Sequence, residues 1–164
     1  MSRTKIQAAT ELALEMLAPV ELISSASAPV PRQVWLHPYV VGFFSAFCNA
    51  AAQTTFDNRN TQEDTSRVIQ AVYEKLFGIS ERELLQPLHV DKSEAKHGWH
   101  NATLILATLS GKATKENEER ISQALLSVPK ETVDRQGAGP SAVGVFWNEH
   151  FVKKVTKLAA GPQE

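Results

Sequence analysis

The sequence predicts an all-α fold: a single compact, irregular bundle of six or seven helices around one uncharged apolar helix at about residues 38–55. Two observations predict it. The 24 residues 33–56 carry no formal charge, and their apolar side chains recur at helical spacing. Amphipathic segments of the same period follow along the chain, and no segment alternates like a strand. All 164 residues are therefore expected to form one domain, 1–164.

Residues 1–23 are expected to form an N-terminal amphipathic helical segment, and its apolar stripe ends before Pro19. Arg3 and Lys5 at its start, with Ala26-Ser27-Ala28 further on, imitate a secretion signal. Acidic residues interrupt the stretch that a signal would keep apolar, so we expect a cytoplasmic protein. The apolar stripe of the helix is Ile6, Ala9, Leu12 or Ala13, Met16 and Leu17, and the interrupting acids are Glu11, Glu15 and Glu21.

Residues 24–33 read SSASAPVPRQ and predict an extended connector that lets the N-terminal helix swing away. Residues 34–160 would then form the helical core. Its central helix begins at Pro38, a residue suited to the first helical position, with His37 as a capping partner. One broad face carries Val40, Phe43, Phe44, Phe47 and Cys48.

That apolar face must be covered, because burying one Val or Phe is worth roughly 1.5 to 3 kcal/mol. Polar residues such as Asn49 lie inside the segment, which favours a protein core over a bilayer, so no membrane span is expected. Cys48 is interpreted as a small core hydrophobe.

The opposite face of the central helix is small or polar, and it supplies candidate interface or pocket residues. Small side chains permit close approach of a second helix, and the amides would need hydrogen-bond partners there. The face could pack within the chain, form a two-fold homodimer seam, or line a small pocket. These residues are Gly42, Ser45, Ala46, Asn49, Ala50 and Gln53.

Capping signals delimit the later helices. Asn60 with Glu63 predicts one start, Gly78 with Ile79 its end, and Ser80 with Glu83 a capping box before a short helix that Pro87 ends. The stripe between them is Val68, Ile69, Val72, Tyr73, Leu76 and Phe77.

Three further helices are expected, and each follows a start signal. The first starts at Asp91 with Glu94 and ends at Gly111, the second starts at Thr114, and a short turn spans 129–135. The last helix starts near Pro140 and ends before Gly161. Their stripes are Trp99, Ala102, Ile105, Leu106 and Leu109; Ile121, Ala124, Leu125 and Val128; and Val143, Trp147, Phe151, Val155 and Leu158.

Glu94, His97 and His100 are candidate metal ligands. Their three-residue spacing stacks side chains on neighbouring helical turns, and Glu-x-x-His is a unit of carboxylate-bridged di-iron sites. The chain has no second copy of this unit, and the two histidines point away from the expected core. Solvent-facing histidines are the other interpretation of the same residues.

Phe146 and His150 lie on the polar side of the last helix, where they are either half-buried under a loop or contacts for a partner. Residues 65–88 resemble a degenerate DNA-binding helix-turn-helix, but Glu74 stands where a small residue is usual and the second helix is acidic. The glycine-rich 137–144 matches no phosphate-binding fingerprint and is interpreted as a loop and cap.

The favoured function is a non-enzymatic interaction or assembly module that acts as a homo-oligomer or binds a protein partner. Lys and Arg number 17 against 18 Asp and Glu, so the chain lacks the basic excess of a nucleic-acid-binding protein. The alternative is a small metal-dependent or ligand-binding enzyme using Glu94, His97 and His100. No cofactor is expected under the first function, and a divalent metal under the second.

Overall fold

The computed structural model describes residues 2–20, 30–85, 92–112 and 114–161. Every regular element within these ranges is a helix and none is a strand, which confirms the predicted all-α fold. None of the helices described is both long and apolar enough to cross a membrane.

The chain divides into two compact units, Met1–Trp99 and His100–Glu164. The boundary falls inside one continuous helix, α7 (Lys92–Ser110), which gives its first turns to the N-terminal unit and the rest to the C-terminal unit. The sequence pattern contains no sign of this boundary. The single-domain organisation of 1–164 stays a prediction.

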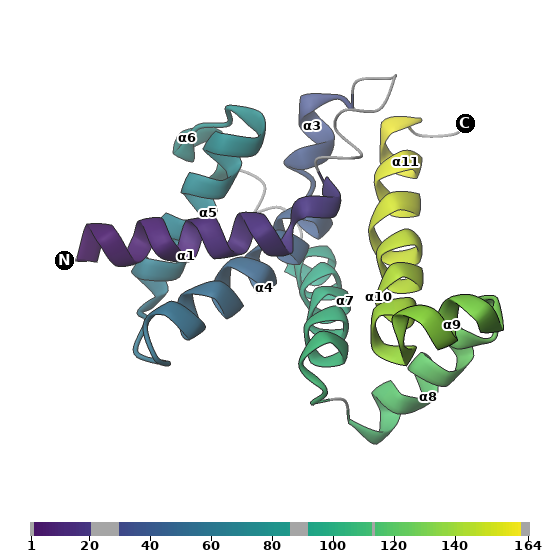
Figure 1. Cartoon of the computed structure of the whole chain (residues 1–164). Coiled ribbons are helices and arrows are strands. Elements are labelled where there is room, and N and C mark those ends of the chain that lie inside the picture. The colour runs from purple at the N-terminus through teal and green to yellow at the C-terminus, as the bar shows by residue number, and fades with distance from the viewer. Residues whose placement is uncertain (1, 21–29, 86–91, 113, 162–164) are drawn as a thin grey trace. The chain divides into compact units, whose positions relative to one another are not determined.

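Three helices form the body of the N-terminal unit: α1 (Ser2–Met16), α4 (Pro38–Thr55) and α5 (Gln62–Phe77). Each packs against the other two, and α1 lies across α4 and α5 (Figure 1). The apolar face of α4 is buried as predicted, since Val40, Phe43, Phe44, Phe47 and Cys48 are all fully covered.

Helix α1 is docked on its neighbours. Ala9, Ala13 and Leu17 are fully buried, because small side chains let the α1 backbone lie close to α4 and α5. The helix ends at Met16, ahead of Pro19 as predicted. Within the described structure α1 is therefore a packed part of the core and not a swinging element. Residues 21–23 of the predicted helix lie outside the described residues.

The predicted connector 24–33 is wrong at its end, because α3 (Arg32–Trp35) begins within it. The reason is the burial of Trp35, whose ring stacks on Phe77 with centroids 4.4 Å apart. The hydroxyl of Tyr73 donates a 2.7 Å hydrogen bond to the Trp35 carbonyl, which fixes the short helix on α5. Residues 21–29 of the connector region lie outside the described residues.

Helix α4 starts as predicted, with Pro38 in its first turn and His37 as its cap. The Nδ1 atom of His37 accepts a 3.2 Å hydrogen bond from the Tyr39 N–H. This bond satisfies one of the backbone donors that every helix leaves open at its start.

Helix α5 begins one residue later than predicted. Thr61 and Asp64 form the capping box, each side chain accepting from the other's backbone N–H, whereas Asn60 and Glu63 were expected. Gly78 ends the helix in the left-handed conformation, φ 63°, with Ile79 buried beside it, as predicted.

Ser80 precedes α6 (Glu81–Leu85), as predicted, and its Oγ accepts a weak 3.5 Å bond from the Glu83 N–H. Pro87 and Asp91, the predicted end of one helix and start of the next, lie outside the described residues.

Helices α4 and α7 cross with their backbones in contact. A Cβ on Gly42 would lie 1.9 Å from the Ala95 carbonyl oxygen, and one on Gly98 would lie 2.0 Å from the Tyr39 carbonyl oxygen. Real Cβ atoms do not approach so closely, so this crossing requires glycine on both helices.

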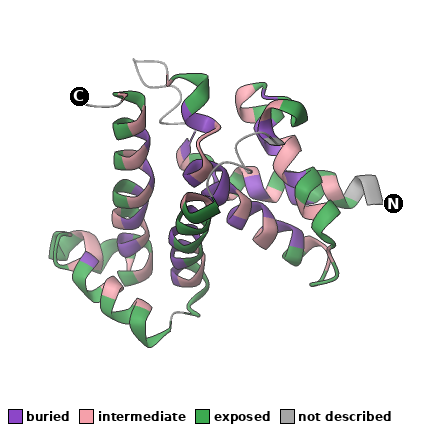
Figure 2. Cartoon of the chain, turned by 180° about the vertical axis from the view of Figure 1, so that it is seen from behind, coloured by how far each residue is buried: buried purple, intermediate pink, exposed green. Residues whose placement is uncertain are grey.

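In the C-terminal unit, α10 packs against α8 and α9 (Figure 1). Thr114 caps α8 as predicted, accepting from the Asn117 N–H at 3.3 Å. Figure 2 shows the buried residues gathered along one side of the long C-terminal helical segment. The elements are α8 (Lys115–Leu125), α9 (Lys130–Gln136), α10 (Ala138–Trp147), a π-helical turn (Asn148–Val152) and α11 (Lys153–Ala159).

The predicted core stripe of α7 is partly wrong. Ala102 and Ile105 are buried, but Leu109 is 55% exposed, and Leu104 and Thr108 are buried in its place. The face turns because α10 begins against it: the Cβ position of Gly139 lies 3.7 Å from the Thr108 carbonyl oxygen.

Phe146 does not lie on a polar face, and its predicted placement is wrong. The side chain is 2% exposed. The sequence predicts one regular helix from Pro140 to Gly161, whereas the chain passes through the π-helical turn Asn148–Val152. A π turn adds a residue to the helical repeat and changes which positions share a face.

Candidate functional site

The best-defined candidate site is a hollow of about 510 Å³ in the N-terminal unit, called here the polar hollow. Its volume lies within the range of about 300 to 1,000 Å³ typical of small-molecule sites. Among the described residues that line it, five carry an amide, three carry a hydroxyl and one is an aromatic ring. They are Asn49, Gln53, Asn58, Asn60, Thr61, Gln62, Thr65, Ser66 and Trp99.

The hollow forms where α4 ends and α5 begins. Asp57 and Asn58 connect the two helices with φ angles of 57° and 63°. Among the described residues, only these two adopt positive φ without being glycine, and Asp and Asn are the non-glycine residues that tolerate it best. The Asn58 N–H reaches back to the Gln53 carbonyl at 2.8 Å. This tight turn brings the polar end of α4 beside the polar start of α5.

Three side chains hold this wall of the hollow together. The Asn60 side-chain amide donates to the Thr65 hydroxyl at 2.9 Å and, more weakly, to the side-chain Oδ1 of Asn49 at 3.5 Å. The Thr65 hydroxyl lies 3.4 Å from the same Asn49 oxygen. Because the bonds join residues from α4, the turn and α5, they fix the positions of the polar groups before any ligand arrives.

No described residue that lines the hollow is an acid, a base or a thiol. The Asp64 carboxylate accepts from the Thr61 N–H at 2.9 Å as part of the capping box. Arg67 pairs with Glu63 at 2.8 Å on α5. The described lining of the hollow itself offers neutral donors and acceptors.

Trp99 provides the one aromatic surface among the described residues that line the hollow. It is 38% exposed, whereas Trp35 and Trp147 are 4% and 7% exposed. Of the three tryptophans in the chain, Trp99 is thus the one whose ring reaches water. An indole that is partly exposed beside polar groups can offer both an apolar face and an N–H donor.

The predicted interface or pocket residues of α4 separate into two groups. Gly42 lies against the α7 backbone, Ala46 is buried, and the Ser45 hydroxyl donates to the Val41 carbonyl at 2.6 Å. This end of the face is used within the chain. The other end stays accessible: Asn49 and Gln53 line the polar hollow, and Ala50 is half-buried.

The predicted metal ligands are not gathered into a metal-binding group. Within the described ranges, which include Glu94, His97 and His100, no three His, Cys, Asp or Glu side chains are placed to hold a metal ion. Both histidines are exposed, and the His97 ring meets Tyr39 edge-on at 5.5 Å.

His150 is half-buried and stacks on Phe146 with ring centroids 6.0 Å apart. Its Nε2 atom lies 3.2 Å from the Arg120 guanidinium, so α8 and the π-helical turn meet at this ring. Phe146 is buried and His150 is half-buried, and a contact of these two residues with a partner stays a prediction.

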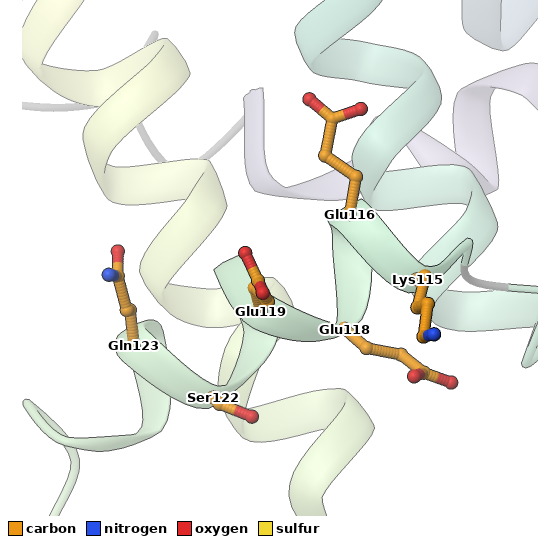
Figure 3. A pocket seen from close by; sticks show the side chains of 6 residues that line it. All are labelled: Lys115, Glu116, Glu118, Glu119, Ser122 and Gln123. Atoms are coloured by element: carbon orange, nitrogen blue, oxygen red, sulfur yellow. The ribbon is translucent and has the colours of Figure 1, made fainter.

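A second hollow, of about 790 Å³, lies along α8. Figure 3 shows that its side chains diverge, with Glu116 and Glu118 pointing to opposite sides of the helix. Acidic groups that do not converge on one point provide no binding geometry, and repulsion between like charges favours their separation.

Other chemical groups singled out in the sequence are structural. Burial raises the pKa of the Cys48 thiol, which keeps it protonated and inert, and burial is also the main cause of the raised pKa of Tyr73. In the segment 65–88, the helix after the turn is described only from Glu81 to Leu85, and Glu83 is bound to Arg32.

Comparison with protein families, curated proteins and solved structures finds no match to this chain.

Sequence reasoning selected Asn49 and Gln53 but missed the other lining residues of the hollow. Asn60 was predicted only as a helix cap, and Asn58 and Thr61 were not among the candidate residues. The signal that could have found them is compositional: residues 58–62 combine three amides with a hydroxyl, which is more polar hydrogen-bonding capacity than one turn and one cap need.

Proposed function

We propose that this protein is a non-enzymatic binding module whose N-terminal unit holds an uncharged polar group of a partner or ligand in the polar hollow. The supporting observation is the lining itself: pre-positioned amides and hydroxyls around one aromatic face, without an acid, base or thiol among the described lining residues. Such a lining suits recognition, since general acid–base catalysis needs a titratable group within hydrogen-bond reach of the reacting atoms.

Two-dimensional ¹H–¹⁵N NMR of the full chain tests this function. N-methylacetamide, uridine, glycerol and maltose are added separately. At least one should shift the side-chain amide signals of Asn49 and Gln53 and the indole N–H signal of Trp99. The indole signals of Trp35 and Trp147 are internal controls, because both rings are buried. No shift at the hollow with any of the four probes would overturn the proposed function.

A second copy of the chain is another candidate partner, as the sequence predicts. The accessible end of the α4 face supports it, because Gln53, which lines the hollow, is exposed and Ala50 on the same helix is half-buried. Light scattering should then give a mass above that of one 18.0 kDa chain, and Gln53→Arg should lower it. A wild-type mass of one chain at 100 µM would eliminate self-association.

A further inference from the structure

We propose that the polar hollow binds a neutral saccharide, a ligand with many hydroxyl groups and one apolar ring face. This proposal depends on the binding function proposed above and names its ligand class. It is carried by three properties of the described lining: the number of its hydrogen-bonding groups, its lack of charge, and the placement of one tryptophan among amides and hydroxyls.

The hydrogen-bonding groups of the hollow match those of a sugar. Each side-chain amide offers both donors and an acceptor, and each hydroxyl of Thr or Ser can donate and accept. A saccharide hydroxyl also does both, so it can pair with either kind of group. Eight of the nine described lining residues carry such a group. An apolar ligand would displace water from them without replacing its hydrogen bonds, which is costly.

The lack of charge among the described lining residues disfavours an anionic ligand. A phosphate or carboxylate brought into the hollow would lose hydration without meeting a cation among the described lining residues. The start of α5, which would otherwise attract an anion, is closed by the Asp64 carboxylate and the Thr61 hydroxyl. The ligand should therefore be neutral.

Trp99 distinguishes a saccharide from a simple polyol. The C–H bonds on one side of a sugar ring form a flat apolar face, which can rest on the electron-rich face of an indole. Trp99 is 38% exposed, and the other described residues that line the hollow can bind hydroxyls. A nucleobase would also stack there, but it presents few polar edge atoms to eight polar residues and, within a nucleic acid, brings phosphates that need basic partners.

The test uses the full chain and its tryptophan fluorescence. Maltose, lactose, cellobiose and N,N′-diacetylchitobiose are titrated to 50 mM, and Trp99 exposure is followed by acrylamide quenching. At least one disaccharide should saturate and reduce quenching about two-fold. Gln62→Ala, at the exposed rim, should weaken binding at least five-fold. Gln123→Ala is the matched control, an exposed glutamine of the C-terminal unit, and should leave the dissociation constant unchanged.

The outcomes separate the two proposals. If no disaccharide alters quenching but N-methylacetamide or uridine shifts the signals of the hollow, the saccharide assignment is overturned while the binding function stands. If a disaccharide binds as tightly to Gln62→Ala, measured by quenching, and to Trp99→Leu, measured by calorimetry, as to the wild type, it binds elsewhere, and the assignment is overturned. If no neutral probe of either experiment binds, both proposals fail.

Discussion

Two buried hydroxyl groups in the C-terminal unit differ in their hydrogen bonding. The Thr108 hydroxyl donates a 2.7 Å bond to the Leu104 carbonyl, whereas the Ser141 hydroxyl has no partner among the described residues. A buried polar group without a partner costs about 1 to 3 kcal/mol. The two residues are 7% and 5% exposed, so they form a matched pair for measuring this cost.

Ser141→Ala should stabilise the protein by about 1 kcal/mol, because it removes the unpaired hydroxyl. Thr108→Val should destabilise it by about 0.5 to 1.5 kcal/mol, because it removes a bonded hydroxyl of similar size. Urea unfolding followed by circular dichroism measures both. A Ser141→Ala variant less stable than the wild type would show that the hydroxyl has a partner, and so would contradict the structure.

At the residue scale, the sequence predicted positions with one strong local preference. His37 as a helix cap and Gly78 as a left-handed terminus were predicted because their chemistry acts within a few residues. The capping residue Thr61 was missed by one position, since Asn60 is an equally good cap by type. Only the tertiary structure shows that the Asn60 amide bonds to Thr65 instead.

At the scale of elements, the crossing of α4 and α7 decides the stability of the N-terminal unit. Gly42→Ala should destabilise it by about 1 to 3 kcal/mol, since the new methyl group would meet the Ala95 carbonyl and force the helices apart. Gly144→Ala is the control, because no atom beyond the neighbouring backbone of its own helix lies within 4 Å of its Cβ position. Alanine there should stabilise the protein by about 0.5 to 1 kcal/mol. Urea unfolding of both variants checks the opposite signs.

The Arg32–Glu83 pair gives a prediction about pH. Arg32 binds both carboxylate oxygens of Glu83 at 2.8 Å and also donates to the Gly78 carbonyl. The side-chain hydrogen bond from Arg32 is the main reason that the pKa of Glu83 is lowered. The ionised Glu83 carboxylate therefore stabilises the folded state at pH values above its ordinary pKa. This stabilisation is lost as the pH falls through the lowered pKa.

Glu83→Gln should accordingly lower the melting temperature at pH 7, and the difference from the wild type should vanish towards pH 2. The effect should be small, because both side chains are exposed and screened by water. Glu81→Gln, on the same helix, controls for the loss of one negative charge. A difference that persists unchanged at pH 2 would show that the carboxylate charge is not what stabilises α6.

Helices were predicted more reliably than the faces they bury. Periodicity identified the segments that became α1, α4, α5, α8 and α10, because an amphipathic stripe is a local pattern. It failed for Leu109 and Phe146, whose burial depends on a neighbouring helix start and on a π-helical turn. Neither feature has a sequence signal as strong as a cap or a glycine terminus.

At the scale of the whole molecule, the fold class followed from the sequence, but the division into two units did not. Helix α7 explains why: Gly98 belongs to one unit and Ala102 and Ile105 belong to the other, yet all three are buried residues of one continuous helix. A sequence pattern shows that a residue is buried without showing which core covers it. The polar hollow was found only in part for the same reason, since its walls come from separate elements.

The two units predict two independent unfolding reactions. Cys48, fully buried in the N-terminal unit and the only cysteine of the chain, can report on that unit through its reaction with Ellman's reagent. Backbone amides of α10, including Phe146, can report on the C-terminal unit through hydrogen exchange. Both measurements are made on the destabilising variant Gly42→Ala and compared with the wild type.

If each unit unfolds on its own core, Gly42→Ala should accelerate Cys48 labelling about 5- to 150-fold, the equivalent of 1 to 3 kcal/mol, and leave α10 exchange within two-fold of the wild type. Gly144→Ala should leave Cys48 labelling unchanged. Equal acceleration of labelling and exchange would instead establish the single cooperative domain that the sequence predicts, because one opening reaction would then expose both cores. The continuous helix α7 makes this comparison informative, since it is the covalent and helical link through which unfolding of one unit would reach the other.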